Sequence, residues 1–306
     1  MAPNPWHLLT ITCFSAAFAG CERPLAPPQR VNTTNVAVLR KALGGADATA
    51  APGSAAPAAE PIGWATIRGR FTLSGSPPPR NPLTVDKDLA VCAPGGKQVL
   101  SEELVVDPAT KGIRDIVIFL ADKNYQPDNP NWEHPDYAAT KDATVEFDQK
   151  NCIFLSHMFV MRTTQTCKIL NSDPVGHNTK IDPTGRAASM NATIPGNGYA
   201  PYEPGGESPE PFSVSCSIHP WMSARMLVRE SPYNAVTAAD GSFEIANVPA
   251  GVPLEFRVWQ ETSKYLQDVT VNGKPEKWAR GRLKLTREPG QELALDVAVD
   301  ASVFAK

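Results

Sequence analysis

The sequence has little charge bias and lacks the long apolar runs of a membrane protein. Its formal net charge is −3 over 306 residues, so nothing indicates the basic face that nucleic-acid binding requires. After the N-terminal region, no apolar run approaches the roughly 20 residues that a helix needs to cross a bilayer. No Ser/His/Asp order, pair of acids or phosphate-cradling glycine loop stands out either. These absences argue against nucleic-acid binding and against the common hydrolytic and nucleotide-dependent enzymes.

Long stretches of helical periodicity are also missing, whereas proline is abundant, with 30 residues. Short alternating segments bounded by Gly, Pro, Asn and Ser recur from residue 64 onward, which is typical of strands joined by turns. We therefore predict an all-β chain of sandwich type. The clearest expected strands are residues 64–73, 113–120, 143–147, 167–170, 212–216, 226–228, 242–245, 254–259, 267–271, 283–286 and 293–299. Residues 182–211 show no apolar period and are expected to form a long loop.

The N-terminal segment has the features of an export signal. Residues 8–19 form an apolar run of signal-peptide length, and the following Phe18-Ala19-Gly20-Cys21 resembles the bacterial lipobox. This pattern predicts an exported protein, periplasmic or on the cell surface, with a lipid anchor on Cys21. The first seven residues lack the usual Lys or Arg, and an ordinary cleaved signal with an incidental cysteine is the alternative.

Composition divides the rest of the chain into four further parts. The Pro- and Ala-rich residues 21–61 cannot build a core and predict a semi-extended tether after the signal at 1–20. A tether behind a lipidated cysteine would hold a folded module away from a membrane. We expect an N-terminal β segment at 62–139, a second β domain at 140–230 and a third at 231–306.

The most informative segment is residues 216–222, which read Cys-Ser-Ile-His-Pro-Trp-Met. Cys216, His219 and Met222 offer a thiolate, an imidazole and a thioether from one short loop. These are the ligand types of a blue-copper site, in which two His and one Cys form a trigonal plane and a Met binds weakly along the axis. Soft sulfur favours Cu(I), and imidazole accepts both oxidation states. The loop therefore predicts one type 1 copper ion per chain.

The motif Cys-x-x-His-Pro-x-Met resembles the short ligand loop of amicyanin-type cupredoxins. The family needs a second, remote histidine, and His177 follows a predicted strand and precedes Asn178, as in those proteins. The resemblance covers roughly residues 140–230. It implies a Greek-key cupredoxin sandwich with His177, Cys216, His219 and Met222 as metal ligands. It also implies that Asn178 and Ser217 brace the ligand loop.

The resemblance further implies one-electron transfer rather than enzymatic chemistry, because four ligands leave no open position on the metal. In the family the imidazole of the ligand loop is the electron gateway. His219, Pro220 and Trp221 are therefore expected to face a redox partner such as a c-type cytochrome or a copper/haem oxidoreductase. Two alternatives stay open: a copper carrier or sensor with the same ligands, and a metal-free cell-surface β-sandwich for adhesion.

Two further features concern the flanking segments. The sequence around Asp240-Gly241, Thr-x-x-Asp-Gly-x-Phe-x-Ile followed by Val-Pro-Ala-Gly, resembles carboxypeptidase regulatory-like (transthyretin-like) β-sandwiches. It implies a second sandwich, within which the copper segment is inserted or against which it is docked. Among the remaining cysteines, a Cys92–Cys152 disulfide would join the N-terminal strands to the copper segment, and Cys152–Cys167 is a rival pairing.

Overall fold

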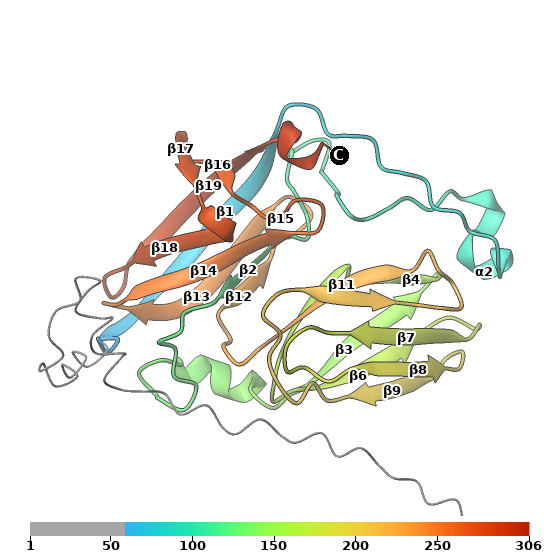
Figure 1. Cartoon of the computed structure of the whole chain (residues 1–306), viewed down its shortest axis with the longest axis horizontal. Coiled ribbons are helices and arrows are strands. Elements are labelled where there is room, and N and C mark those ends of the chain that lie inside the picture. The colour runs from blue at the N-terminus through green and yellow to red at the C-terminus, as the bar shows by residue number, and fades with distance from the viewer. Residues whose placement is uncertain (1–58, 306) are drawn as a thin grey trace, which may run out of the picture. The chain divides into compact units, whose positions relative to one another are not determined.

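The computed structural model describes residues 59–305, so the predicted signal, the lipidation at Cys21 and nearly all of the tether lie outside it. Within the described range, strands in four sheets dominate, accompanied by one short α-helix and four 3₁₀ turns. The predicted all-β sandwich class is confirmed (Figure 1). No helix between residues 59 and 305 is long and apolar enough to cross a membrane.

Two of the sheets form what we call the host sandwich. One sheet has the order β13-β1-β19-β16-β17, and the other has the order β12-β2-β14-β15 with β18 paired to β14. Their strands are β1 (Gly63–Ser74), β2 (Val117–Leu120), β12 (Asn234–Val236), β13 (Ser242–Ala250), β14 (Pro253–Gln260), β15 (Lys264–Tyr265), β16 (Asp268–Val271), β17 (Lys274–Lys277), β18 (Arg282–Thr286) and β19 (Glu292–Asp300). The 3₁₀ turns η3 (Ala279–Gly281) and η4 (Ala301–Phe304) lie in the same part of the chain.

The core of the host sandwich follows from strand alternation. Ala65, Ile67, Phe71 and Leu73 of β1 are buried, since alternate side chains of a strand point to the same face. The strand expected at residues 113–120 is shorter in the structure, and only Val117–Leu120 is regular. Asp115 adopts a left-handed φ of 64°, which interrupts the extended conformation just before β2.

The other two sheets form what we call the inserted sandwich. Their orders are β5-β11-β10-β7-β8 and β4-β3-β6-β9. The strands are β3 (Thr144–Lys150), β4 (Ile153–Phe154), β5 (Met158–Arg162), β6 (Thr166–Asn171), β7 (His177–Asp182), β8 (Met190–Ile194), β9 (Tyr199–Tyr202), β10 (Phe212–Ser215) and β11 (Ser223–Arg229). A 3₁₀ turn, η2 (Pro135–Thr140), precedes them. The expectation of one long loop at residues 182–211 was wrong: β8 and β9 are edge strands, and their few buried side chains leave no apolar alternation in the sequence.

The chain order of the strands makes the second sandwich an insertion in the first. β2 pairs antiparallel with β12, with Ile118 opposite Ala235, and strands β3 to β11 all lie between these two in sequence. The segments at 62–139 and 231–306 therefore share one host sandwich. The chain leaves this sandwich after β2 and re-enters it at β12.

A third apolar cluster and a buried ion triad join the two sandwiches. Phe119 and Trp259 of the host cluster with Met158 and Leu227 of the insert. Beside them, Glu261, which follows β14, accepts a hydrogen bond from Arg225 Nε at 2.9 Å and contacts His157 Nε2 at 2.5 Å. His157 and Glu261 are both buried. This junction therefore combines apolar burial with charges that have little access to water.

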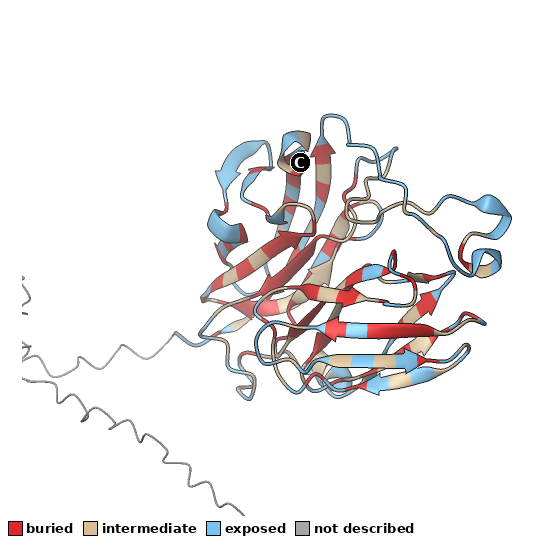
Figure 2. Cartoon of the chain, turned by 45° about the vertical axis from the view of Figure 1, so that its right-hand side comes forward, coloured by how far each residue is buried: buried red, intermediate tan, exposed pale blue. Residues whose placement is uncertain are grey.

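The long connection between β1 and β2 also reaches the inserted sandwich. Its residues 83–99, which we call the cap segment, are closed at the base by the Leu83 N–H donating to the Val99 carbonyl at 2.9 Å. The segment carries the helix α2 (Leu89–Cys92) and the 3₁₀ turn η1 (Pro94–Gly96). Its residues are mostly exposed, apart from the buried Cys92 (Figure 2). Cys92 is bonded to Cys152 of the insert.

The triad predicts that acid weakens the fold. Burial alone would raise the pKa of Glu261, but the hydrogen bond and charge of His157, with Arg225, lower it to about 2 from an ordinary value near 4.5. The unfolded chain therefore takes up this proton first as the pH falls. The stability from the ionised Glu261 beside protonated His157, whose pKa is raised, is complete from pH 4.5 upward while the imidazole keeps its proton. It is lost as the pH falls towards about 2, a change of roughly 3 kcal/mol.

Urea unfolding of Glu261→Gln and wild type between pH 2 and 6 measures this contribution. The variant is expected to lose stability at pH 6 and to show a flatter pH dependence. Glu288→Gln, an exposed residue with no side-chain bond within the described chain, is the matched control. Parallel pH profiles for Glu261→Gln and wild type would contradict the assignment.

Candidate metal centre

The candidate site lies where a hairpin loop meets the first residues of a neighbouring strand. β10 and β11 pair antiparallel with Ser215 opposite Ser223, so residues 216–222 form the loop of that hairpin. β10 also pairs with β7, with Ser215 opposite Lys180. Continuing this antiparallel register places His177, the first residue of β7, beside the loop. The strand pairing thus brings together residues that are about 40 positions apart.

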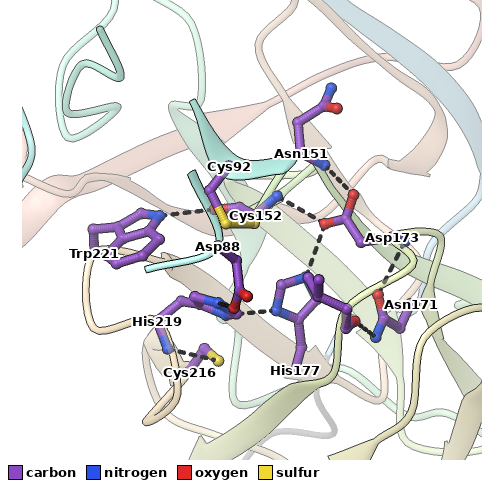
Figure 3. Close-up of a disulfide and its surroundings, with 11 residues drawn as sticks. Asp88, Cys92, Asn151, Cys152, Asn171, Asp173, His177, Cys216, His219 and Trp221 are labelled. Carbon is purple, nitrogen blue, oxygen red and sulfur yellow. Dashed lines mark hydrogen bonds and ion pairs between the residues drawn. A yellow bond between two sulfur atoms is a disulfide. The ribbon is translucent and has the colours of Figure 1, made fainter. Parts of the chain in front are cut away.

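The two histidines face each other through the same ring atom. His177 Nδ1 lies 2.8 Å from His219 Nδ1, and both side chains are fully buried. Suitable donor atoms of His177, Cys216 and His219 all lie within 4.8 Å of one another. Figure 3 shows the two imidazoles turned towards one another, with Cys216 beside His219. The structure therefore converges three of the four predicted ligands on one point.

A carboxylate holds the opposite edge of each imidazole. His177 Nε2 lies 2.8 Å from Asp173 Oδ2, and His219 Nε2 lies 2.7 Å from Asp88 Oδ2 (Figure 3). A neutral imidazole carries one N–H, and a carboxylate accepts it. Donation from both Nε2 atoms leaves the two Nδ1 lone pairs facing each other. Such an arrangement needs either a shared proton or a metal ion between the rings.

The electrostatics of Cys216 suit a metal ligand. Burial alone would raise the pKa of its thiol, but the interaction with the neighbouring His177 and hydrogen bonds from backbone N–H groups outweigh this, so the pKa lies below the ordinary value. The backbone donors are Asn178 at 3.3 Å and His219 at 3.4 Å from Sγ. Burial alone would likewise lower the pKa of His177, and its bonds to Cys216 and Asp173 raise it. A thiolate beside two imidazoles is a donor set that copper or zinc accepts.

Asn178 and Ser217 meet through a backbone bond. The Asn178 side-chain oxygen accepts a hydrogen bond from the Ser217 N–H, while the Asn178 backbone N–H points at Cys216 Sγ. The amide nitrogen of Asn178 donates to Asn191 Oδ1 at 2.5 Å. Asn178 thus ties the ligand loop to β7 and β8, whereas the Ser217 contact uses the main chain and not its hydroxyl.

Met222 closes the loop. Its side chain is 1 % exposed. Its N–H donates to the His219 carbonyl at 2.9 Å, and its carbonyl accepts from the Cys216 N–H at 3.3 Å. These bonds fold the loop back on itself and keep the methionine beside the two residues that share the motif with it. The backbone therefore keeps Met222 within the short loop that carries Cys216 and His219.

The prediction that Trp221 faces a partner was wrong. The ring is buried, its Nε1–H donates to the Cys152 carbonyl at 3.2 Å, and its centre lies 5.1 Å from that of His219. His219, predicted as a partly exposed gateway, is fully buried because Asp88 of the cap segment covers its Nε2 edge. Of the three residues predicted to dock a partner, Pro220 alone is exposed.

The cysteines outside the loop are also placed. Cys92 and Cys152 form a disulfide with Cα atoms 4.9 Å apart, and the rival Cys152–Cys167 pairing is absent. Cys167 is a buried free thiol, and burial raises its pKa to about 12. It is therefore a neutral core residue at physiological pH. The disulfide lies close to the site, since donor atoms of Cys92, Cys152 and His219 also fall within 4.8 Å of one another.

Sequence reasoning missed the two carboxylates. Asp173 lies four residues before His177 in a segment that indicated only a turn, and it also accepts hydrogen bonds from the backbone N–H groups of Asn151 and Cys152, at 2.7 and 2.8 Å. Asp88 precedes helix α2, where an aspartate usually caps the helix, but its side chain makes no capping bond. The one available signal was the predicted disulfide, which places Asp88 four residues from a cysteine near the site.

Comparisons of the whole chain with known proteins give only partial alignments with solved structures. No family model matches the chain, and no curated protein sequence matches it. Solved structures that align with part of it include the P52G variant of amicyanin in its reduced Cu(I) form, at 15% identity and a TM-score of 0.25 over 28% of this chain and 82% of that one. The copper-containing nitrite reductase from Thermus scotoductus SA-01 aligns at 14% identity and a TM-score of 0.27 over 29% of this chain and 23% of that one.

Asp173→Ala is expected to destabilise the metal-free protein by roughly 3 kcal/mol. It removes a buried carboxylate that accepts three hydrogen bonds, and it leaves two backbone N–H groups without a partner. Urea unfolding in the presence of a chelator measures the loss. Asp182→Ala, which removes an exposed carboxylate paired only with Lys180, is the control and should change stability by less than about 1 kcal/mol. Equal effects of the two substitutions would refute the anchoring role of Asp173.

Proposed function

We propose that this protein binds one copper ion through His177, Cys216, His219 and Met222 and passes single electrons between redox partners. The observation that carries the proposal is the pair of buried Nδ1 atoms 2.8 Å apart beside a thiol of lowered pKa. When bound at such a donor set, copper alternates between Cu(II) and Cu(I) and so carries one electron.

The protein's own residues supply the geometry of such a site. Asp173 and Asp88 fix the ring orientation of the two histidines from their far edges. Asn178 fixes the loop that carries the cysteine and the second histidine. Because the two histidines, Cys216, Asp173 and Asn178 are buried, the donors are held in place before metal arrives, and water has little access to them. A rigid, dry ligand set keeps rearrangement during electron transfer small.

The wider setting is also part of the proposal. The export signal and Cys21 suggest a lipid-anchored protein at the periplasmic or cell surface, with the Pro/Ala-rich tether as spacer. The partner would be a redox protein such as a c-type cytochrome or a copper/haem oxidoreductase. We further propose that the host sandwich is a carboxypeptidase regulatory-like module that carries the copper module. Four protein ligands leave no position for a substrate, so no enzymatic role is proposed.

The visible absorption spectrum of the protein after addition of Cu(II) tests the proposal. Cu(II) added to the purified protein is expected to give an intense visible charge-transfer band from the thiolate, and Cys216→Ser should abolish it. Cys167→Ser removes the second free thiol of the described residues 59–305, which belongs to none of the potential metal-binding groups there, and is expected to keep the band. Reversible one-electron voltammetry of the coloured protein would complete the case.

The other outcomes identify the alternatives. Tight copper binding without the band would reject electron transfer and favour a carrier or sensor. No tight binding would leave a metal-free sandwich for adhesion. Loss of the band in Cys167→Ser but not in Cys216→Ser would contradict the ligand assignment.

A further inference from the structure

The edge of His219 that would lie nearest a redox partner is covered by a residue from the other sandwich. Asp88 belongs to the cap segment, which connects β1 to β2 of the host, whereas His219 lies in the hairpin loop of the insert. Their side chains meet at 2.7 Å although 131 positions separate them in sequence. This contact is therefore built by the tertiary fold and not by the ligand loop itself.

Three attachments hold the cap segment over the ligand loop. Asp88 binds His219, the neighbouring Lys87 Nζ donates to the Ile218 carbonyl at 3.2 Å, and Cys92 is bonded to Cys152. Cys152 also receives the Trp221 N–H on its carbonyl, and Trp221 packs against His219. Figure 3 shows the disulfide, the tryptophan and Asp88 arranged around the same imidazole. The cap is thus fastened on both sides of His219.

The backbone conformation of Asp88 accompanies this contact with His219 and not a side-chain capping bond to the helix. Its φ and ψ are 47° and 39°, in the left-handed region that Asp tolerates but most residues avoid. Its carbonyl accepts from the N–H groups of Val91 and Cys92, at 2.8 and 2.9 Å. Its carboxylate makes no capping bond and is directed at His219 instead. The turn that leads to Cys92 therefore fixes the carboxylate on the imidazole.

We propose that Asp88 is a positioning residue for His219, held in place by the Cys92–Cys152 disulfide. The inference deepens the proposed function and rests on it. By accepting the Nε2–H, the carboxylate fixes the tautomer in which Nδ1 is free to bind the metal. Its negative charge also stabilises the higher positive charge of Cu(II) over that of Cu(I). The host sandwich thereby tunes a metal centre whose ligands all belong to the insert.

The first test needs no copper. In the metal-free full-length protein, the ¹⁵N shifts of the His219 ring should show a hydrogen on Nε2 in almost every molecule. Asp88→Ala is expected to give a mixture of tautomers, and so is the disulfide-free Cys92→Ala/Cys152→Ala protein with Asp88 retained. Asp86→Asn, which changes an exposed acid in the same segment with no bond within the described chain, should leave the tautomer unchanged. Circular dichroism confirms that each variant is folded.

The second test uses the copper-loaded protein. Asp88→Asn keeps an oxygen that accepts the hydrogen bond but removes the charge. The ratio of Cu(II) affinity to Cu(I) affinity is expected to fall roughly tenfold, which for one electron is a rise of 59 mV in reduction potential. Asp86→Asn removes the same charge two residues away and should shift the ratio by less than about twofold.

The outcomes separate this inference from the proposed function. Equal shifts for Asp88→Asn and Asp86→Asn would show a general field effect and overturn the specific role of Asp88. An unchanged His219 tautomer in Asp88→Ala would overturn it as well, even with no metal present. If the tautomer responds as expected but wild type gives no thiolate band, the positioning by Asp88 stands while the copper function fails.

Discussion

Two imidazole Nδ1 atoms held 2.8 Å apart between buried rings constrain the rest of the site. Such a pair repels unless a cation lies between the rings, so the surrounding residues must hold the rings against that repulsion. Asp173 and Asp88 do so from the outer edges, and Asn178 does so through the loop. The lowered pKa of Cys216 adds a third donor to the same point. Each of these contacts holds one of the two rings, or the loop that carries His219, in position.

The constraint explains why the two sandwiches are joined as firmly as they are. A carboxylate reaching across from the cap segment is useful only if its position relative to His219 is fixed. The apolar cluster around Phe119 and Leu227, the buried Glu261 triad and the Cys92–Cys152 disulfide together fix it. Because β2 and β12 pair with each other, the insert is also held at both of its ends. The junction thus has the character of a core and not of a flexible linker.

The sequence predicted those parts of the molecule that depend on local pattern. Alternation in β1 and in β10 identified strands, and the ligand types were recognised because Cys216, His219 and Met222 lie within one loop. The solvent exposure of the side chains in the ligand loop could not be predicted from local pattern. His219 is covered by Asp88, 131 positions earlier in the chain, and Trp221 donates to Cys152, 69 positions earlier, and nothing in the loop itself indicates these contacts. Asp88 and Asp173 were missed for a related reason: an aspartate before a helix or in a turn usually serves the local backbone. The edge strands β8 and β9 were not predicted, because solvent-facing strands need no apolar alternation.

The insertion between β2 and β12 also has a consequence for how such a protein can be inherited. All four proposed ligands travel together in residues 144–229, so recombination could move them as a block into another chain. Asp88 and Cys92 would not be transferred with this block. In the new chain, His219 would lack its carboxylate partner and Cys152 would lack its disulfide partner. Host and insert therefore depend on each other at this site, although each has its own hydrophobic core.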